Sequence, residues 1–262
     1  MGTHENLLKL VNIGKSFGNI VALKDINFEI GNNEIIGLLG DNGAGKSTLI
    51  KIITGVYKPD VGEMFWKGEK LKGYSATKAR EIGIQTVFQD RALAEQHSLW
   101  RNIFMGHEIS GRFGFINIKK QKEETKKLMT EIMGFTSSAV TPDAIVGKMS
   151  GGERQGVAIS RALYFNADLV ILDEPTTGLS LKETKRVLEF IEGIKERHKS
   201  CIFISHNIYH VYPIVDRIVV VDRGKIVGSF NKCDISLEEL VEKLYLVAES
   251  GKMCGASEAY MP

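Results

Sequence analysis

A glycine-rich segment between an apolar run and a helical pattern places the strongest constraint on the fold of this 262-residue chain. Residues 40–47 read GDNGAGKS and satisfy the pattern GxxxxGK[ST]. They follow the run Ile35 to Leu39, an expected buried strand, and precede an apolar helix starting near Lys46. Glycines let the backbone wrap closely around an anion so that its N–H groups face phosphate oxygens, and the helix amino end adds about half a positive charge. A plain glycine turn is the alternative, but the strand before it and the helix after it favour a phosphate loop.

The end of this loop carries the residue types that bind phosphate and a divalent cation. Lys46 is placed to reach the β and γ phosphates of a nucleotide, and the hydroxyl of Ser47 can bind Mg²⁺. A second apolar run, Leu169 to Leu172, is followed by Asp173 and Glu174. An Asp at a strand end can hold Mg²⁺, and the next Glu can polarise a water that attacks the terminal phosphate. Carboxylates that merely mark a strand end are the alternative, which a neighbouring phosphate loop disfavours.

Short apolar runs alternate with longer segments of helical period, a pattern typical of an α/β protein with a largely parallel sheet. The expected buried strands are 35–39, 84–88, 169–172 and 201–204. The chemically competent residues that follow them are Gly40, Gln89, Asp173 and, after Ser205, His206. In open α/β sheets ligands bind outside the carboxyl ends of the strands, so these endings predict one shared site.

The remaining segments predict helices and one hairpin. Leu181 to His198 has amphipathic helical spacing, and Arg223-Gly224 is a plausible tight turn within the apolar stretch 218–230. Ser236 with Glu239 predicts a capping box that opens a C-terminal helix. The region from about Arg91 to Lys148 lacks strong strand patterns and includes the charged stretch KKQKEETKK, which we interpret as a helix with a solvated face inside a helical insertion.

The segment SGGERQ at 150–155 precedes another helical run and has two interpretations. It fits a capping box in which Ser150 accepts from the amide of Glu153 and Glu153 reaches back. It also fits a second phosphate-facing helix amino end, with glycines that allow close approach. The physics of the sequence does not choose between the two.

Composition excludes several classes of protein. The chain is 43% hydrophobic and 25% charged with a formal net charge of +2, which is typical of a soluble globular protein and not of a disordered or collagen-like chain. Nearly balanced charge argues against bulk attraction to nucleic acid or an anionic membrane. No apolar run approaches the roughly 20 residues needed to span a bilayer, and the first residues lack the apolar core of a secretory signal. Three cysteines without CxxC spacing favour neither a disulfide framework nor a zinc site and suggest a reducing cytoplasm.

Taken in order, these motifs resemble the nucleotide-binding subunit of ATP-binding cassette (ABC) transporters. The order is the phosphate loop at 40–48, Gln89 after a strand, SGGERQ at 150–155, LVILDEPTTGLS at 169–180, and His206 after another strand. The resemblance covers essentially residues 7 to 248. It implies an α/β fold: a P-loop NTPase (RecA-like) core with a parallel sheet, an antiparallel β subdomain and a helical insertion subdomain. Residues 1–248 would form the nucleotide-binding domain, with the helical subdomain at approximately 91–165, and 249–262 a flexible C-terminal tail.

The resemblance implies ATP and Mg²⁺ as cofactors and assigns roles to individual residues. Lys46, Glu174 and His206 are implied to be catalytic, with His206 contacting the γ phosphate. Phe17 is implied to stack on the adenine, although a lone aromatic among apolar residues also fits a core position, and a lone His also fits a satisfied structural residue. The implied magnesium ligands are Ser47, Gln89 and Asp173. Gln89 is also implied to relay the state of the magnesium site to the membrane partner. The implied nucleotide contacts are Phe17, Gly40, Asn42, Gly43, Ala44, Gly45, Lys46, Ser47, Thr48, Gln89, Ser150, Gly151 and Gly152.

The family's geometry also implies partners. Two copies sandwich two ATP molecules, each phosphate loop facing Ser150 and Gly152 of the other copy, so we expect a homodimer in the ATP-bound state. Two transmembrane permease subunits and, indirectly, an extracytoplasmic sugar-binding protein complete the implied transporter. The chain itself is then expected in the cytoplasm, peripheral on the inner face of the cell membrane.

Departures from the family pattern narrow the resemblance. The family usually has Asp where this chain has Ser180, and RNIFMG at 101–106 and GLSLKET at 178–184 are similar to the ATPases of monosaccharide importers. Most of those carry two cassettes in tandem, whereas this chain has one phosphate loop and one SGG motif, which fits the single-cassette form. Glu153 replaces the commoner Gln and Met149 the commoner Leu, and we expect neither to abolish activity.

Other functions stay open at this level. A soluble ABC ATPase acting on nucleic acid or ribosomes would usually pair two cassettes or insert long arms and carry basic surfaces, which this chain lacks. No nucleic-acid partner is therefore expected. An importer ATPase for a solute other than a sugar shares every motif. A nucleotide-sensing module without turnover is disfavoured by the intact Lys46, Asp173, Glu174 and His206.

Overall fold

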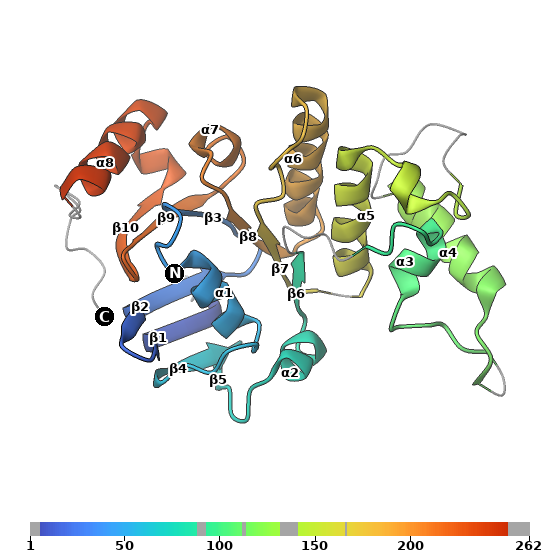
Figure 1. Cartoon of the computed structure of the whole chain (residues 1–262), viewed down its shortest axis with the longest axis horizontal. Helices are drawn as coiled ribbons and strands as arrows, with labels where there is room; N and C mark the ends of the chain where they lie inside the picture. The colour runs from blue at the N-terminus through green and yellow to red at the C-terminus, as the bar shows by residue number, and fades with distance from the viewer. Residues whose placement is uncertain (1–5, 88–92, 112–113, 132–140, 166, 251–262) are drawn as a thin grey trace.

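The chain folds around two β-sheets in the computed structural model, which describes residues 6–87, 93–111, 114–131, 141–165 and 167–250 (Figure 1). A four-stranded antiparallel sheet has the order β2-β1-β4-β5, and a six-stranded sheet has the order β10-β9-β3-β8-β7-β6. The strands of the first sheet are β1 (Asn6–Phe17), β2 (Ile20–Gly31), β4 (Val61–Trp66) and β5 (Glu69–Lys70). Those of the second are β3 (Ile35–Leu39), β6 (Ile84–Val87), β7 (Leu169–Asp173), β8 (Ser200–Ile204), β9 (Arg217–Asp222) and β10 (Lys225–Asn231). All neighbours in the second sheet pair in parallel except β10, which pairs antiparallel with β9.

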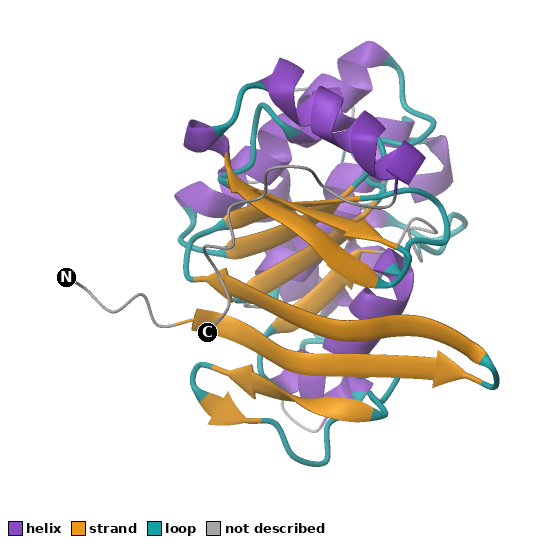
Figure 2. Ribbon diagram, turned by 90° about the vertical axis from the view of Figure 1, so that its left-hand side faces the viewer, coloured by secondary structure: helices purple, strands orange, loops and turns teal. Residues whose placement is uncertain are grey.

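Helices connect the parallel strands and cover the six-stranded sheet. Figure 2 shows the two sheets as separate layers, with most helices on the side of the six-stranded sheet away from the other sheet. The α-helices of the described residues are α1 (Lys46–Ile53), α2 (Ala76–Glu81), α3 (Leu99–Phe104), α4 (Ile118–Glu131), α5 (Gly151–Tyr164), α6 (Leu181–Glu196), α7 (Ile208–Val211) and α8 (Leu237–Ser250). Among them, none combines the length and apolar character needed to cross a bilayer.

Strand β3 shows how both faces of the central sheet become buried. Ile36 and Leu38 point into a core shared with α1 and the four-stranded sheet. Ile35 and Leu39 point into a second core shared with α5, α6 and α7. Side chains alternate between faces along a strand, so a strand covered on both sides reads as a continuous apolar run rather than an alternating one. This is why the sequence indicated buried parallel strands here.

Removing a side chain from the middle of this sheet should cost a large share of the stability. Phe203 in β8 is fully buried, and we expect Phe203→Ala to lower the free energy of unfolding by about 3–5 kcal/mol, through lost burial and the cavity left behind. Phe115, 77% exposed, provides the matched control, and Phe115→Ala should change it by less than about 0.5 kcal/mol. Urea denaturation followed by circular dichroism measures both. Equal effects of the two substitutions would contradict the assigned core.

Helices α3, α4 and α5 form a segment with its own apolar cluster at the end of the molecule opposite β1 and β2 (Figure 1). Asn102 of α3 is fully buried and anchors the preceding loop, donating to the carbonyls of Ala94, His97 and Ser98 and accepting from the amide of Ala94. In the charged helix α4, Gln121, Thr125, Leu128 and Met129 are buried. The lysines flanking them are mostly exposed, as the sequence indicated.

The expected element types are confirmed, with small differences at their ends. The six-stranded sheet contains the four predicted parallel strands; β6 ends at Val87, and residues 88–92 lie outside the described part. The hairpin turns at Arg223-Gly224, because β9 and β10 pair as Lys225↔Asp222. The capping box of α8 is present: the amide of Glu239 donates to Ser236 Oγ and the amide of Ser236 to Glu239 Oε2. Helix α6 stops two residues before His198, which has a positive φ of 57°.

Candidate nucleotide-binding site

The phosphate loop closes on its own lysine at the carboxyl end of β3. Lys46 Nζ donates to the carbonyl oxygens of Gly40 (2.5 Å) and Asp41 (2.9 Å), so the side chain crosses the loop it terminates. Gly40 has a φ of 153°, and a Cβ there would lie 2.2 Å from the carbonyl oxygen of Val221. Burial lowers the pKa of Lys46, while the negative charges of Glu174, Asp173 and Asp41 act in the opposite direction. The ammonium group is thus held beside the carboxylates at the end of β7.

The rest of the loop is open to solvent. Asn42, Gly43 and Ser47 are exposed, and Thr48 is half-buried. Ala44 is buried, and its carbonyl accepts from the amide of Gly224 at 2.8 Å in the β9–β10 turn. The hairpin therefore supports the loop from beneath, while its backbone and the Ser47 hydroxyl stay accessible to a ligand.

The two carboxylates at the end of β7, Asp173 and Glu174, lie in different environments. Burial and the charge of Glu174 raise the pKa of Asp173, and Lys46 and Lys51 oppose this rise. A neighbouring cation would stabilise the charged form of this carboxylate. Mg²⁺ is typically bound through one or two carboxylates together with substrate phosphates and water, so Ser47 and Asp173 fit this ion without a dedicated cage. No cluster of three or more His, Cys, Asp or Glu suited to a metal occurs within the described residues.

Glu174 occupies a strained turn and is held from several sides. Its φ of 49° is uncommon for a residue with a side chain and marks the sharp turn after β7. Its Oε1 accepts from the backbone amide of His206 (3.0 Å) and faces His206 Nδ1 at 2.8 Å. Its Oε2 accepts from the hydroxyls of Ser205 and Thr177, both at 3.2 Å. The carboxylate side chain is 14% exposed and that of His206 63%, so the pair opens toward solvent on the imidazole side.

A hydrogen-bonded ring ties the loop after β7 to the loop after β8. Ser205 Oγ, which donates to Glu174, accepts from the amide of Asn207 at 3.1 Å. Asn207 Nδ2 lies 3.2 Å from His210 Nε2, and His210 Nδ1 lies 3.0 Å from Thr176 Oγ1. Burial lowers the pKa of His210, and nearby His206 lowers it further. A neutral His210 with Nδ1 protonated accepts from Asn207 and donates to Thr176. The contact with Thr176 closes the hydrogen-bonded ring, because Thr176 lies in the loop that carries Glu174.

The amino end of α5 carries the predicted capping box. The amide of Glu153 donates to Ser150 Oγ (3.3 Å), and the amide of Ser150 donates to Glu153 Oε2 (2.9 Å). The amide of Gly152 donates to Glu183 Oε1 at 3.1 Å. Within the described part of the chain, no hydrogen bond joins Ser150, Gly151 or Gly152 to the phosphate loop, and Figure 1 shows α5 and α1 on opposite sides of β6 and β7. The two glycine-rich helix ends are therefore separate within one chain.

Two other predicted contacts have different outcomes. Phe17 does not lie in the core: it is 41% exposed at the end of β1, with its ring edge-on to Tyr57 at 5.2 Å and Lys15 Nζ at 5.4 Å from its centroid. The exposed part of its ring is accessible to a flat ligand. Gln89 lies outside the described residues.

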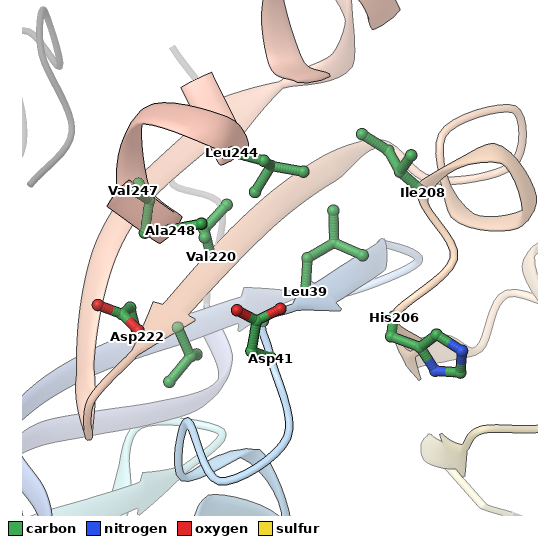
Figure 3. A pocket seen from close by; sticks show the side chains of 11 residues that line it. Leu39, Asp41, His206, Ile208, Val220, Asp222, Leu244, Val247 and Ala248 are labelled. Carbon is green, nitrogen blue, oxygen red and sulfur yellow. The ribbon is translucent and has the colours of Figure 1, made fainter. Parts of the chain in front are cut away.

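A small hollow borders the start of the phosphate loop (Figure 3). It measures about 110 Å³ and lies between Asp41, His206, the end of β9 and the α8 side chains Leu244 and Val247. Its lining includes Gly40 and Asp41, whereas the exposed residues Asn42, Gly43 and Ser47 lie outside it. A phosphate bound to these exposed residues would therefore lie on an open surface of the single chain.

Several residues around the site were not predicted from the sequence. They are Ser205, Asn207, His210 and Glu183. Ser205, His210 and Glu183 make contacts between segments distant in sequence, and Asn207 joins Ser205 to His210 locally. Glu183 alone had a local signal, because Ser180 and Glu183 form the S-x-x-E pattern of a capping box.

A phosphate loop closed on a buried lysine, two carboxylates at the end of a parallel strand and a histidine after the next strand define a P-loop nucleotide-binding ATPase. Residues 23–177 match the family described as ABC transporter, and the chain belongs to this family. It is an ATP-binding cassette with a catalytic site for ATP hydrolysis.

Relatives in sequence are ATP-binding proteins of sugar importers. The xylose/arabinose import ATP-binding protein XylG of Sulfolobus acidocaldarius is 42% identical over 90% of this chain and 93% of its own length. The fructose import ATP-binding protein FrcA of Rhizobium meliloti is 35% identical, again over 90% and 93%. The ribose import ATP-binding protein RbsA of Caldanaerobacter subterraneus is 34% identical over 92% of this chain, which spans only 48% of RbsA.

Solved structures share the fold. The ATP-binding cassette MJ1267 of an ABC transporter, in its ADP conformation, has a TM-score of 0.76 at 24% identity and covers 92% of this chain and 95% of its own. CbiO1 of Clostridium perfringens, part of the transporter complex CbiONQ, has a TM-score of 0.74 at 25% identity, with coverage of 94% and 96%. The dimeric cassette MJ0796 bound to ADP and Pi has a TM-score of 0.72 at 24% identity, with coverage of 86% and 98%.

Proposed function

We propose that this chain energises the import of a monosaccharide and works as a pair of identical cassettes that close around ATP. The proposal rests on one observation: four residues lie close together at the carboxyl ends of the parallel strands, where the site is open to solvent. They are Lys46, Asp173, Glu174 and His206. Support for a sugar as the solute comes from the names of the relatives XylG, FrcA and RbsA.

The proposed chemistry follows from the positions of the side chains. The Lys46 ammonium and the loop amides would bind the β and γ phosphates. Ser47 and Asp173 would hold Mg²⁺, which would supply positive charge to the phosphate oxygens. Glu174 orients a water and takes its proton on a carboxylate oxygen as the water attacks the γ phosphorus. In its imidazolium form, which has an N–H on both ring nitrogens, His206 would donate to Glu174 through Nδ1 and to the γ phosphate through Nε2. Positioning and charge neutralisation supply most of the acceleration in phosphoryl transfer.

Pairing of two chains completes the site in this proposal. One chain leaves much of its phosphate loop exposed, and its second glycine-rich helix end, at Ser150, Gly151 and Gly152, lies apart from that loop. A second copy turned by a two-fold axis would bring that helix end to the exposed phosphates, and an isologous contact creates two equivalent sites. Phe17 would stack on the adenine from its exposed place at the end of β1.

The helical segment offers a surface for the permease. Met105, Phe115, Ile116 and Ile118 are exposed apolar residues around the α3–α4 connection. A hollow of about 350 Å³ lies nearby, between α2, the strand β6 and the ends of α3 and α5, lined by Arg80, His107 and Phe165 among others. Exposed apolar side chains that gather on one segment mark interaction surfaces. Docking there would hold the chain on the inner face of the membrane.

Affinity purification of the tagged chain from detergent-solubilised membranes tests the transport assignment. The expected partners are a permease and an extracytoplasmic sugar-binding protein, and pentoses or hexoses presented with that binding protein should raise ATP hydrolysis. Recovery of a permease whose binding protein takes a solute other than a sugar would correct the substrate. Salt-sensitive binding of DNA or RNA without a permease would overturn the assignment in favour of a non-transport ATPase.

A further inference from the structure

One carboxylate lies between the amino ends of two helices. Glu183 belongs to the first turn of α6, where its Oε2 accepts from the amide of Ser180 (3.0 Å) and from Ser180 Oγ (2.8 Å). Its other oxygen, Oε1, accepts from the amide of Gly152 in the first turn of α5 at 3.1 Å. The contact with Gly152 joins residues 31 positions apart. In the sequence, α5 precedes and α6 follows β7, the strand next to Glu174.

The packing around this contact depends on glycine. A Cβ at position 152 would lie 3.0 Å from Glu183 Cβ and 3.2 Å from its Cγ, which is tighter than ordinary side-chain contact. The absence of a side chain at Gly152 thus lets the glutamate lie across the amino end of α5. The amides of Ser180 and Gly152 hold the pKa of Glu183 down to about 2, so the carboxylate is charged at any physiological pH.

In the single chain, the amino end of α5 is therefore already occupied by an anion. A helix amino end attracts negative charge through its free amides and dipole. In the pair of cassettes proposed above, the Gly152 amide is one of the donors that face the ATP held by the partner. Glu183 and that phosphate compete for the same N–H and repel each other at short range.

We propose that Glu183 is a positioning residue that competes with the partner's ATP for the amino end of α5, so that it must release Gly152 before the two cassettes close. The inference rests on the proposed pairing. The inference also bears on the loop that has Ser180 instead of the usual Asp. Ser180 caps α6, and the negative charge near this loop belongs to Glu183, whose carboxylate binds the amino end of α5.

The test compares Glu174→Gln with Glu174→Gln/Glu183→Gln in an ATP titration of pairing, followed by analytical ultracentrifugation. Loss of the competing charge should lower the ATP concentration at half-maximal pairing about two- to fivefold. Glu239→Gln in the same background is the matched control, because Glu239 makes the same capping contacts in α8 without touching α5, and it should leave the midpoint unchanged. An unchanged or raised midpoint in the Glu183 variant would overturn the inference, since a mere cap predicts that result.

A second measurement separates this inference from the pairing itself. Glu183→Gln keeps an amide oxygen that can accept from Gly152, so amide hydrogen exchange is compared between Glu183→Ala and the unmodified chain. In the nucleotide-free chain, exchange at Gly152 should be faster in Glu183→Ala. Equal exchange rates would overturn the contact on which the competition rests. If exchange responds but Glu174→Gln never pairs at any ATP concentration, the proposed pairing has failed, and the competition fails with it.

Discussion

Glu174→Gln is expected to stop ATP turnover while leaving ATP binding intact. General-base catalysis typically contributes about 10²–10⁴-fold to a rate, so phosphate release should fall by that factor. The amide keeps the shape of the side chain and can accept from Ser205 or Thr177, so the loop after β7 should keep its conformation. Lys46 and the phosphate loop are unchanged, and the variant should accumulate as an ATP-bound dimer.

A phosphate-release assay and size-exclusion chromatography with and without ATP measure the two consequences. Glu189→Gln is a suitable control, because it makes the same chemical change as Glu174→Gln at an exposed position of α6. It should leave turnover unaltered. Normal hydrolysis by Glu174→Gln would show that another group takes the proton, and the catalytic assignment would then be wrong.

Lys46→Ala is expected to weaken ATP binding about 10- to 100-fold, the range that a charge-assisted hydrogen bond to phosphate provides. Lys46 is buried beside Asp173 and Glu174, so its removal also leaves these two carboxylates with less positive charge nearby to offset their repulsion of the triphosphate. Both effects act in the same direction. Fluorescence titration with a labelled ATP analogue measures the dissociation constant.

The control for this change is Lys58→Ala, at an exposed lysine that follows α1. It removes the same charge from the chain without touching the loop, and the dissociation constant should stay the same. Thermal unfolding should also be compared, because Lys46 bonds to Gly40 and Asp41 in the absence of ligand. If a folded Lys46→Ala chain binds ATP with unchanged affinity, the assignment of the phosphate loop to the ATP-binding site is wrong.

The sequence predicted those parts of the fold and site that have local causes. The phosphate loop follows from glycines at fixed spacing, and the buried strand β3 from a run of five apolar residues whose two faces are both covered. Capping boxes at Ser150 and Ser236 require only residues three positions apart. The shared site follows from the common direction of parallel strands, which brings Lys46, Asp173 and His206 to one edge.

The parts not predicted depend on pairs of residues that only the fold brings together. Ser205 and Glu174 are 31 positions apart, as are Gly152 and Glu183, and no periodicity connects either pair. His210 reads in the sequence as an isolated histidine on a short helix, and its role in the ring with Thr176 and Asn207 depends on the spacing of β7 and β8. The positive φ of Glu174 likewise has no signal in the sequence, because this conformation is uncommon for any residue with a side chain.

Mixing two inactive variants tests the pairing of cassettes most directly. Lys46→Ala removes the phosphate-binding ammonium, and Gly151→Asp places a negative charge at the amino end of α5, where the helix itself tolerates Asp. In a pair of identical variants each site carries one defect, whereas a mixed pair has one site with both defects and one site with none. Random pairing should therefore restore ATP hydrolysis to about a quarter of the unmodified rate. If hydrolysis stays absent at every mixing ratio although the chains pair, the site does not combine the phosphate loop of one chain with the α5 end of another.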